Sequence, residues 1–333
     1  MERADFLVEL GTEELPPKAL KRLSEAFTAG IVDGLKNEHL SHSAVHSYAA
    51  PRRLAVWVEA LQTAQPDKQT ERRGPAVQAA FDDNGLPTQA ARGFARSCGV
   101  EVEQLETLET DRGSWLVHRG FEQGKTAAAL LPTIVQQSLD KLPIPKRMRW
   151  GDLSAEFVRP VHWLVLLLGE TVIEAEILAV HSGRQSRGHR FHHPQPITVT
   201  RPAEYAPLLE TEGRVLADFA ARREAIRGQV QEAAGRLGGQ AVIDAALLDE
   251  VTSMVEWPVA VAGSFDERFL EVPAEALVSA MKGHQKYFHL VDAQGGLMPN
   301  FITVSNIDSK NIDAVRDGNE RVIRPRLADA EFF

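Results

Sequence analysis

The first sixty residues carry a hydrophobic pattern that predicts a strand, a helix and two further strands. An apolar run starts at Phe6, and a polar turn with two prolines follows it. Beyond the prolines, apolar residues recur every three or four positions, which predicts an amphipathic helix that the prolines open. These positions are Leu20, Leu23, Phe27, Ile31 and Leu35. Two β-rich runs, Val45–Tyr48 and Leu54–Val58, then predict strands joined by the tight segment AAPRR.

The middle of the chain predicts short helices and strands separated by polar segments. Residues 62–75 are polar and are expected to form a connection. Residues 142–150 are rich in proline and basic residues and are expected to form an ordered loop. We expect helices at Pro75–Phe81, Thr88–Cys98 and Thr126–Leu139, and strands at Ser114–Phe121, Val161–Leu168 and Val172–Val180. The last two strands are expected to form a hairpin.

The last third also mixes the two kinds of element. We expect helices at Arg201–Glu212, Asp218–Leu237, Leu247–Val255 and Pro273–Lys282, and strands at Val259–Ala262, Tyr287–Val291 and Phe301–Val304. The second of these helices is expected to place Arg222, Arg223, Glu224 and Arg227 on its solvated side. Strand clusters with separate helices favour an α+β fold with mixed sheets over strict βαβ alternation. We expect three segments, at residues 1–65, 66–200 and 201–333.

Composition narrows the class of protein. The 333 residues are 44% hydrophobic and 25% charged, as in soluble globular proteins with about two domains. No apolar run approaches the roughly 20 residues of a membrane-spanning helix. The single cysteine, Cys98, excludes an internal disulfide and a cysteine-based zinc site, which fits a reduced cytoplasmic setting. No recognisable base accompanies Cys98, so a packed structural thiol is favoured over a nucleophile.

Charge is segregated along the chain. A net charge of −9 argues against a general nucleic-acid coat, yet residues 181–201 contain four arginines and no acidic residue. Basic residues also cluster in other predicted turns and at strand ends. The planar guanidinium group of arginine is well suited to bind phosphate groups. The candidate contacts are Arg52, Arg53, Arg72, Arg73, Lys146, Arg147, Arg149, Arg159, Arg187 and Arg190. The same side chains could instead pair with the 46 acidic residues, and the sequence leaves both roles open.

Motifs that carry catalysis are missing from the sequence. There is no phosphate-binding G-x-x-x-x-G-K-[ST] loop, nucleophile elbow or H-E-x-x-H helix. His181, His189, His192 and His193 could be read as metal ligands, but a polar-network role is favoured because adjacent histidines in a strand point to opposite faces. The adjacent carboxylates Glu13 and Glu14 are expected to cap the first helix. We therefore expect neither a catalytic residue nor a metal site.

Several strings, taken in order, resemble one family. The chain opens with FLVELGTEELPPKAL and continues with APRRLAV, RRGPA, KLPIPKRMRWG, FVRPVHW, RGHRF, VEWPV, VPAEALVSAMKGHQKYF and NERVIRPRLADAEFF. Together they span nearly the whole chain. The chain resembles the beta subunit of the tetrameric, bacterial-type glycyl-tRNA synthetase.

The resemblance implies a role that the residues alone do not name. Such enzymes join glycine to tRNA(Gly) using ATP, and their alpha subunit carries the class II catalytic core. The resemblance implies that ATP and Mg²⁺ bind to alpha, and that the beta subunit serves tRNA engagement and assembly. It also implies a fold like the body and tail domains of archaeal CCA-adding enzymes. Class I and class II synthetase signatures are not evident here, so this chain is not expected to activate an amino acid.

Two other functions remain open. The chain could be a protein-interaction scaffold that docks alpha or other beta domains without touching RNA, or a metal-dependent hydrolase built around His189. The two phenylalanines that end the sequence, Phe332 and Phe333, lie inside a predicted helix and favour docking. They also suggest a fragment of a longer chain, and the resemblance implies that the HD-like and anticodon-binding domains of the family are the parts it lacks.

Overall fold

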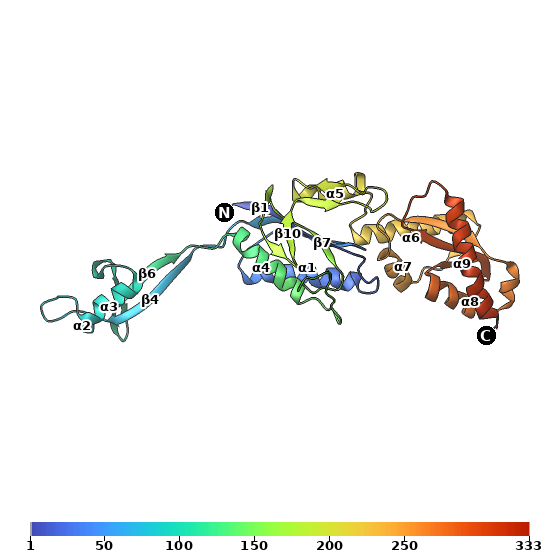
Figure 1. The fold of residues 1–333 in the computed structure, drawn as a ribbon. Coiled ribbons are helices and arrows are strands. Elements are labelled where there is room, and N and C mark those ends of the chain that lie inside the picture. Colours follow the sequence, from blue (N-terminus) through green and yellow to red (C-terminus); the bar gives the residue numbers. More distant parts are fainter. Residues whose placement is uncertain (1, 333) are drawn as a thin grey trace. The chain divides into compact units, whose positions relative to one another are not determined.

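The computed structural model describes residues 2–332 and shows the expected α+β fold (Figure 1). The chain divides into two compact units. Unit 1 consists of residues 1–2, 38–40 and 62–130, and unit 2 consists of residues 3–37, 41–61 and 131–333. The segment boundaries expected at residues 65 and 200 stay a prediction. Phe333 lies outside the described residues.

The main sheet of unit 2 has the strand order β2-β3-β1-β7-β10-β9, and β8 pairs with β7. Its strands are β1 (Arg3–Thr12), β2 (Val45–Ala50), β3 (Arg53–Gln62), β7 (Val161–Leu168), β8 (Thr171–Val172), β9 (Glu176–Ile177) and β10 (Val180–Gly183). The central pair, β1 and β7, is antiparallel, with Val8 opposite Leu166. Both strands are buried along most of their length, which explains their nearly continuous apolar sequences.

Helices cover both faces of this sheet (Figure 1). On one face lie α1 (Leu20–Asn37) and α4 (Ala127–Asp140). The two helices approach closely at Gly34, where an added Cβ would lie only 2.6 Å from the Ile134 side chain. On the other face, Leu7 and Val165 share a buried cluster with Tyr205. That tyrosine opens α5 (Tyr205–Thr211), which follows the small ladder of β11 (Gln185–Arg187) and β12 (Pro196–Thr198) and the 3-10 turn η2 (Pro202–Glu204).

The rest of unit 2 is a second sheet with the order β13-β15-β16-β14. Its strands are β13 (Gln240–Ala241), β14 (Val259–Ser264), β15 (Phe288–Val291) and β16 (Leu297–Ser305). One apolar cluster joins it to α6 (Phe219–Arg236) and α7 (Ala245–Thr252), and another joins it to α8 (Ala274–Ala280) and α9 (Ile312–Phe332). The 3-10 helix η3 (Glu267–Glu271) and the short π-helix η4 (Met281–Gln285) flank α8. The predicted pairing of 287–291 with 301–304 is confirmed, with Phe288 opposite Ile302.

Unit 1 is built mainly from residues 62–130 around a sheet of order β4-β6-β5. Its elements are β4 (Lys68–Ala76), α2 (Val77–Ala80), α3 (Gln89–Cys98), η1 (Val102–Gln104), β5 (Glu106–Thr110) and β6 (Gly113–Glu122). A small cluster of Ala80, Ala91 and Leu116 forms its core. The predicted helix 88–98 is confirmed, with Thr88 as its N-cap and Gly99 in the left-handed C-terminal position.

Three expectations about secondary structure were wrong. Residues 68–75 form part of β4 instead of a connection, and no residue of β4 is buried, so its sequence lacks the apolar alternation that marks a strand. The expected strand 172–180 is broken, because Leu178 and Ala179 adopt positive φ and turn the chain so that β10 pairs parallel with β7. The first helix begins at Leu20, three residues after the second proline.

Arg222 corrects the expected solvated face of α6. Its side chain is fully buried and donates hydrogen bonds to the carbonyl oxygens of Ala49, Leu216 and Thr252, at 2.7, 2.5 and 3.0 Å. A guanidinium has five N–H donors and no acceptor, so three backbone carbonyls can hold it inside the fold. A sequence pattern that classes arginine as polar does not detect this arrangement.

Candidate functional site

The segment that follows β1 lies against two other loops of unit 2. The amide of Thr12 donates to the carbonyl of Arg52 at 2.8 Å, and the amide of Glu13 donates to the carbonyl of Pro160 at 2.9 Å. The turn between β2 and β3 and the segment that enters β7 are thereby fixed to the end of β1. Basic residues far apart in sequence consequently lie around one end of the main sheet.

A buried carboxylate, Glu9, is the centre of this region. Its Oε2 atom accepts hydrogen bonds from Arg53 and from the Ser186 hydroxyl, each at 3.0 Å. The Tyr205 hydroxyl donates to the same oxygen at 2.5 Å, and the Trp163 indole donates to the other. Burial, and then the negative charge of Glu9, raise the pKa of Tyr205 well above its usual value. Tyr205 therefore stays a neutral hydrogen-bond donor.

Arg53 is a structural member of this network. Its side chain has no exposed surface. It donates to the Arg187 carbonyl at 2.7 Å and lies 3.7 Å from the Glu256 carboxylate. Burial alone lowers the pKa of Arg53, but the Glu9 and Glu256 carboxylates outweigh it and the pKa is raised. Arg53 therefore stays charged inside the fold, where it fixes the backbone at Arg187.

Three guanidinium groups surround the Trp163 ring. Arg52, Arg53 and Arg187 lie 5.6, 5.5 and 5.3 Å from its centroid, within the range of cation–π attraction. Arg52 and Arg53 are buried, whereas Arg187 is exposed. The ring lies directly over Gly11, where a Cβ would come within 1.9 Å of it. Of the three guanidinium groups that contact the Trp163 ring, only that of Arg187 is exposed to solvent.

The loop at Glu13 and Glu14 pairs with the remaining basic residues of this region. Glu13 accepts from Arg190 at 2.7 Å and from His162 at 2.8 Å, while Arg159 donates to the Glu14 carbonyl at 3.0 Å. The hydrogen bond from Arg190 is the main cause that lowers the pKa of Glu13. The expectation that these carboxylates cap the first helix was wrong, because their partners lie on other segments and the helix begins only at Leu20.

The histidines around His189 serve the backbone. His189 is buried, its Nε2 contacts the Asn306 carbonyl at 2.7 Å, and its Nδ1 accepts from the amides of Phe191 and His192 at 3.1 and 3.2 Å. The His192 ring accepts from the Asp308 amide at 3.0 Å. With both nitrogens of His189 engaged by the backbone, neither is left for a metal. Within residues 2–332, no group of three or more His, Cys, Asp or Glu side chains is arranged to hold one.

Lys146, Arg147 and Arg149 lie on the predicted ordered loop 142–150. Arg149 pairs with Glu156 at 2.9 Å, and Arg147 donates to the Asp140 carbonyl at 3.1 Å, whereas Lys146 is exposed and forms no ion pair within residues 2–332. Beside this loop is a cavity of about 510 Å³, which we call the proline cavity. Its lining consists of Pro16, Ala19, Leu23, Pro143, Ile144, Pro145, Lys146, Arg147, Met148, Val158 and Arg159.

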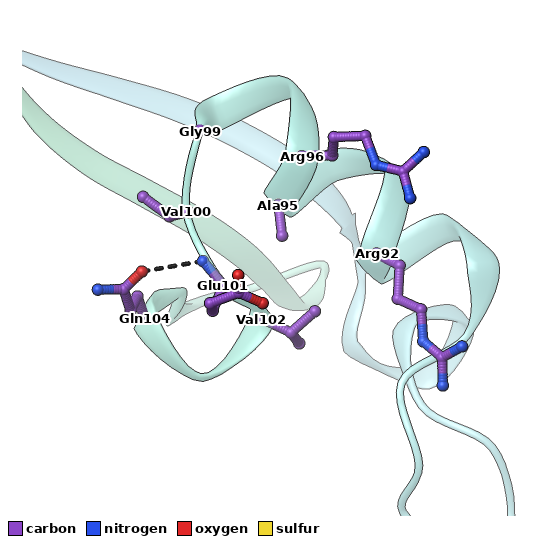
Figure 2. A pocket seen from close by; sticks show the side chains of 8 residues that line it. All are labelled: Arg92, Ala95, Arg96, Gly99, Val100, Glu101, Val102 and Gln104. Carbon is purple, nitrogen blue, oxygen red and sulfur yellow. Dashed lines mark hydrogen bonds between the residues drawn. The ribbon is translucent and has the colours of Figure 1, made fainter.

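Arg72 and Arg73 belong to unit 1. Arg72 donates to the Ser97 carbonyl at 2.9 Å, and the Arg73 guanidinium lies 3.9 Å from the Trp115 ring centroid. The same unit has a cavity of about 440 Å³. Figure 2 shows Arg92 and Arg96 projecting from α3, with Glu101 and Gln104 on the segment that follows. This basic pair was not predicted from the sequence, although the spacing of four residues on one helix could have indicated it.

The structure therefore separates the predicted basic residues into three groups. Arg52, Arg53, Arg159, Arg187 and Arg190 lie around the end of β1, the loop residues 146–149 line or flank the proline cavity together with Arg159, and Arg72 and Arg73 lie in unit 1. Glu9, which holds the first group together, was not predicted from the sequence. A lone acidic residue within an apolar strand was the available signal.

Comparison with known proteins gives a consistent result. A family model described as glycyl-tRNA synthetase beta subunit matches residues 6–333. The glycine–tRNA ligase beta subunit of Marinobacter nauticus is 60% identical over 334 residues, and that of Hahella chejuensis is 58% identical over 333 residues. Each match covers all of this chain and 48% of the relative, so the chain spans about half the length of these proteins. The chain belongs to the glycyl-tRNA synthetase beta subunit family.

Proposed function

We propose that this chain is the N-terminal part of a glycine–tRNA ligase beta subunit, and that it supports tRNA binding and assembly with the alpha subunit. The family match and the names of the relatives support the enzyme assignment. The arrangement of basic residues in unit 2 supports the role in RNA binding. In this proposal the region contributes to ATP-dependent glycylation of tRNA(Gly) without forming bonds itself.

The observation that carries the RNA proposal is the position of Arg187. Its guanidinium is exposed, lies over Trp163 and forms no ion pair within residues 2–332. Its backbone carbonyl is held by buried Arg53, which is held in turn by Glu9. An exposed arginine with a fixed backbone and no carboxylate partner is suited to bind a phosphate group. Arg190 is nearby in sequence and can exchange its contact with Glu13 for a phosphate.

We assign the chemistry to the alpha subunit. ATP and Mg²⁺ are proposed to bind there, and this chain is proposed to contribute no catalytic residue. The cytoplasmic setting and the likeness to CCA-adding enzymes stay predictions. Within residues 2–332, none of the helices combines the length and apolar character needed to cross a bilayer.

The test replaces Arg187 and Arg190 with alanine in the complete enzyme and measures tRNA affinity at low and moderate salt. Loss of the two contacts is expected to weaken binding about tenfold or more at low salt, and less at moderate salt because phosphate contacts are screened. Arg201→Ala is the matched control, since Arg201 is also exposed but pairs with Glu170 and Glu204. It should leave the affinity unchanged.

Unchanged affinity of the double variant at both salt concentrations would refute the RNA contact. If the variant instead loses the alpha subunit on co-purification while its tRNA affinity is kept, the scaffold function is the correct one. Thermal unfolding of the variant checks that removing the Arg190–Glu13 pair has not unfolded the loop.

A further inference from the structure

We propose that the proline cavity receives an apolar side chain from the alpha subunit, on a segment that carries carboxylates beside that side chain. The inference rests on the assembly part of the proposed function and adds where alpha docks and what chemistry it presents. It is independent of the RNA contact at Arg187, because no residue of that contact lines the cavity.

The lining of the cavity determines the chemistry of the occupant. Apart from Lys146, Arg147 and Arg159, the described lining residues are apolar, and none is acidic. They come from the segment that precedes α1 and from its first turn, from the loop 142–150 and from the segment before β7. A volume of about 510 Å³ can take a large apolar side chain with part of its backbone. Burial of that side chain would supply the binding energy.

The cavity is already formed without an occupant. The amide of Met148 donates to the Phe157 carbonyl at 2.8 Å, and the reverse bond, from Phe157 to Met148, measures 3.1 Å. Arg147 fixes the same loop to the end of α4 through the Asp140 carbonyl. Prolines at 143 and 145 further restrict the backbone. A rigid cavity loses little conformational entropy on binding, which favours a docking role.

The charged residues that line the cavity are basic, which favours a partner with acidic side chains. Lys146 is exposed and forms no ion pair within residues 2–332. Two carboxylates that flank the lining segments already pair with other arginines, because Glu14 lies near Arg190 and Glu156 pairs with Arg149. A carboxylate of the partner could therefore form an ion pair with the Lys146 ammonium group. Complementary charges of this kind fix orientation and speed association.

An unpaired RNA base fits the cavity less well. Bases are usually held by stacking on aromatic or arginine planes and read by hydrogen bonds along their edges. The described lining contains no aromatic, hydroxyl or amide side chain, and its two arginines, Arg147 and Arg159, already donate to the backbone carbonyls of Asp140 and Glu14. The apolar lining thus favours a protein segment over a nucleotide.

The experiment measures the affinity of purified alpha subunit for full-length beta subunits that carry changes at the cavity. Met148→Glu places a charge in the apolar lining and should weaken alpha binding at least about tenfold. Lys146→Glu should weaken it about threefold or more and make the remaining affinity less sensitive to salt. Met148 is 41% exposed, so the substitution does not require a buried charge in the free chain.

Two matched controls lie outside the lining. Leu153→Glu changes an apolar residue with 38% exposure, and Lys141→Glu reverses an exposed charge. Both should bind alpha like the unmodified chain. Thermal unfolding of all four variants shows whether each is folded.

The outcomes separate this inference from the proposed function. If the unmodified beta subunit does not bind alpha, the assembly function fails and the docking inference fails with it. If it binds alpha and the folded Met148→Glu and Lys146→Glu variants bind equally well, only the docking inference is overturned. Weaker tRNA binding by these variants with unchanged alpha binding would assign the cavity to RNA, and would also overturn it.

Discussion

At the residue scale, the site depends on a carboxylate that no sequence pattern marked as functional. Glu9 accepts four hydrogen bonds from side chains that lie in β3, β7, β11 and α5. The apolar run around it predicted the strand correctly, but the partners are up to 196 residues away. Their meeting depends on tertiary packing, which local periodicity does not encode. The candidate arginines were found from residue type alone, and the sequence could not separate buried Arg53 from exposed Arg187.

Replacing Glu9 with glutamine should strongly destabilise the chain. The change leaves the Arg53 charge buried with only the more distant Glu256 carboxylate, and breaking a buried ion pair typically costs about 3–5 kcal/mol. The free energy of unfolding, measured with urea, gives the loss. Glu25→Gln, at an exposed position of α1, should change it by less than about 0.5 kcal/mol. Equal stability of the two variants would show that the Glu9 network does not hold this end of the sheet.

At the element scale, long periodic segments were predictable and weakly patterned ones were not. The helices at 20–37 and 127–140 bury an apolar face, so their periodicity predicted them, whereas the helix at 219–236 has the fully buried Arg222 among its buried residues. The strand β4 buries nothing and escaped prediction. The break at Leu178 and Ala179 also escaped, because neither residue type favours the positive φ found there. The loop at Glu13 was correctly predicted as a turn, but its contacts with Arg190 and His162 were not predicted.

The contact between Glu13 and Arg190 should make stability depend on pH. The folded pKa of Glu13 is lowered below the ordinary glutamate pKa of 4.5. The contact therefore stabilises the chain at pH values above 4.5, and this contribution is lost as the pH falls through the lowered folded pKa. Unfolding of the unmodified chain and of Glu13→Gln should therefore differ at neutral pH and converge under acid. Both side chains are partly exposed, so the difference should be small and should shrink with salt. A difference that persists below the folded pKa would contradict this assignment.

At the scale of the whole molecule, the resemblance of ordered strings predicted the family, and the structure shows how some of them meet. The opening string contacts the turn in APRRLAV and the segment FVRPVHW through backbone hydrogen bonds. RGHRF supplies Arg190, which pairs with Glu13, and VEWPV supplies Glu256, which lies near Arg53. Strings that read as isolated motifs thus form one end of unit 2. The role of that surface could not be read from its arginines alone, because most of them pair within the chain.

The most direct test of the account is the steady-state kinetics of the complete enzyme carrying Arg187→Ala and Arg190→Ala. If this region binds tRNA and alpha performs the chemistry, the KM for tRNA should rise about tenfold, while glycine-dependent exchange of pyrophosphate into ATP keeps its rate. An unchanged KM for tRNA, or an exchange rate that falls in parallel with charging, would contradict the account.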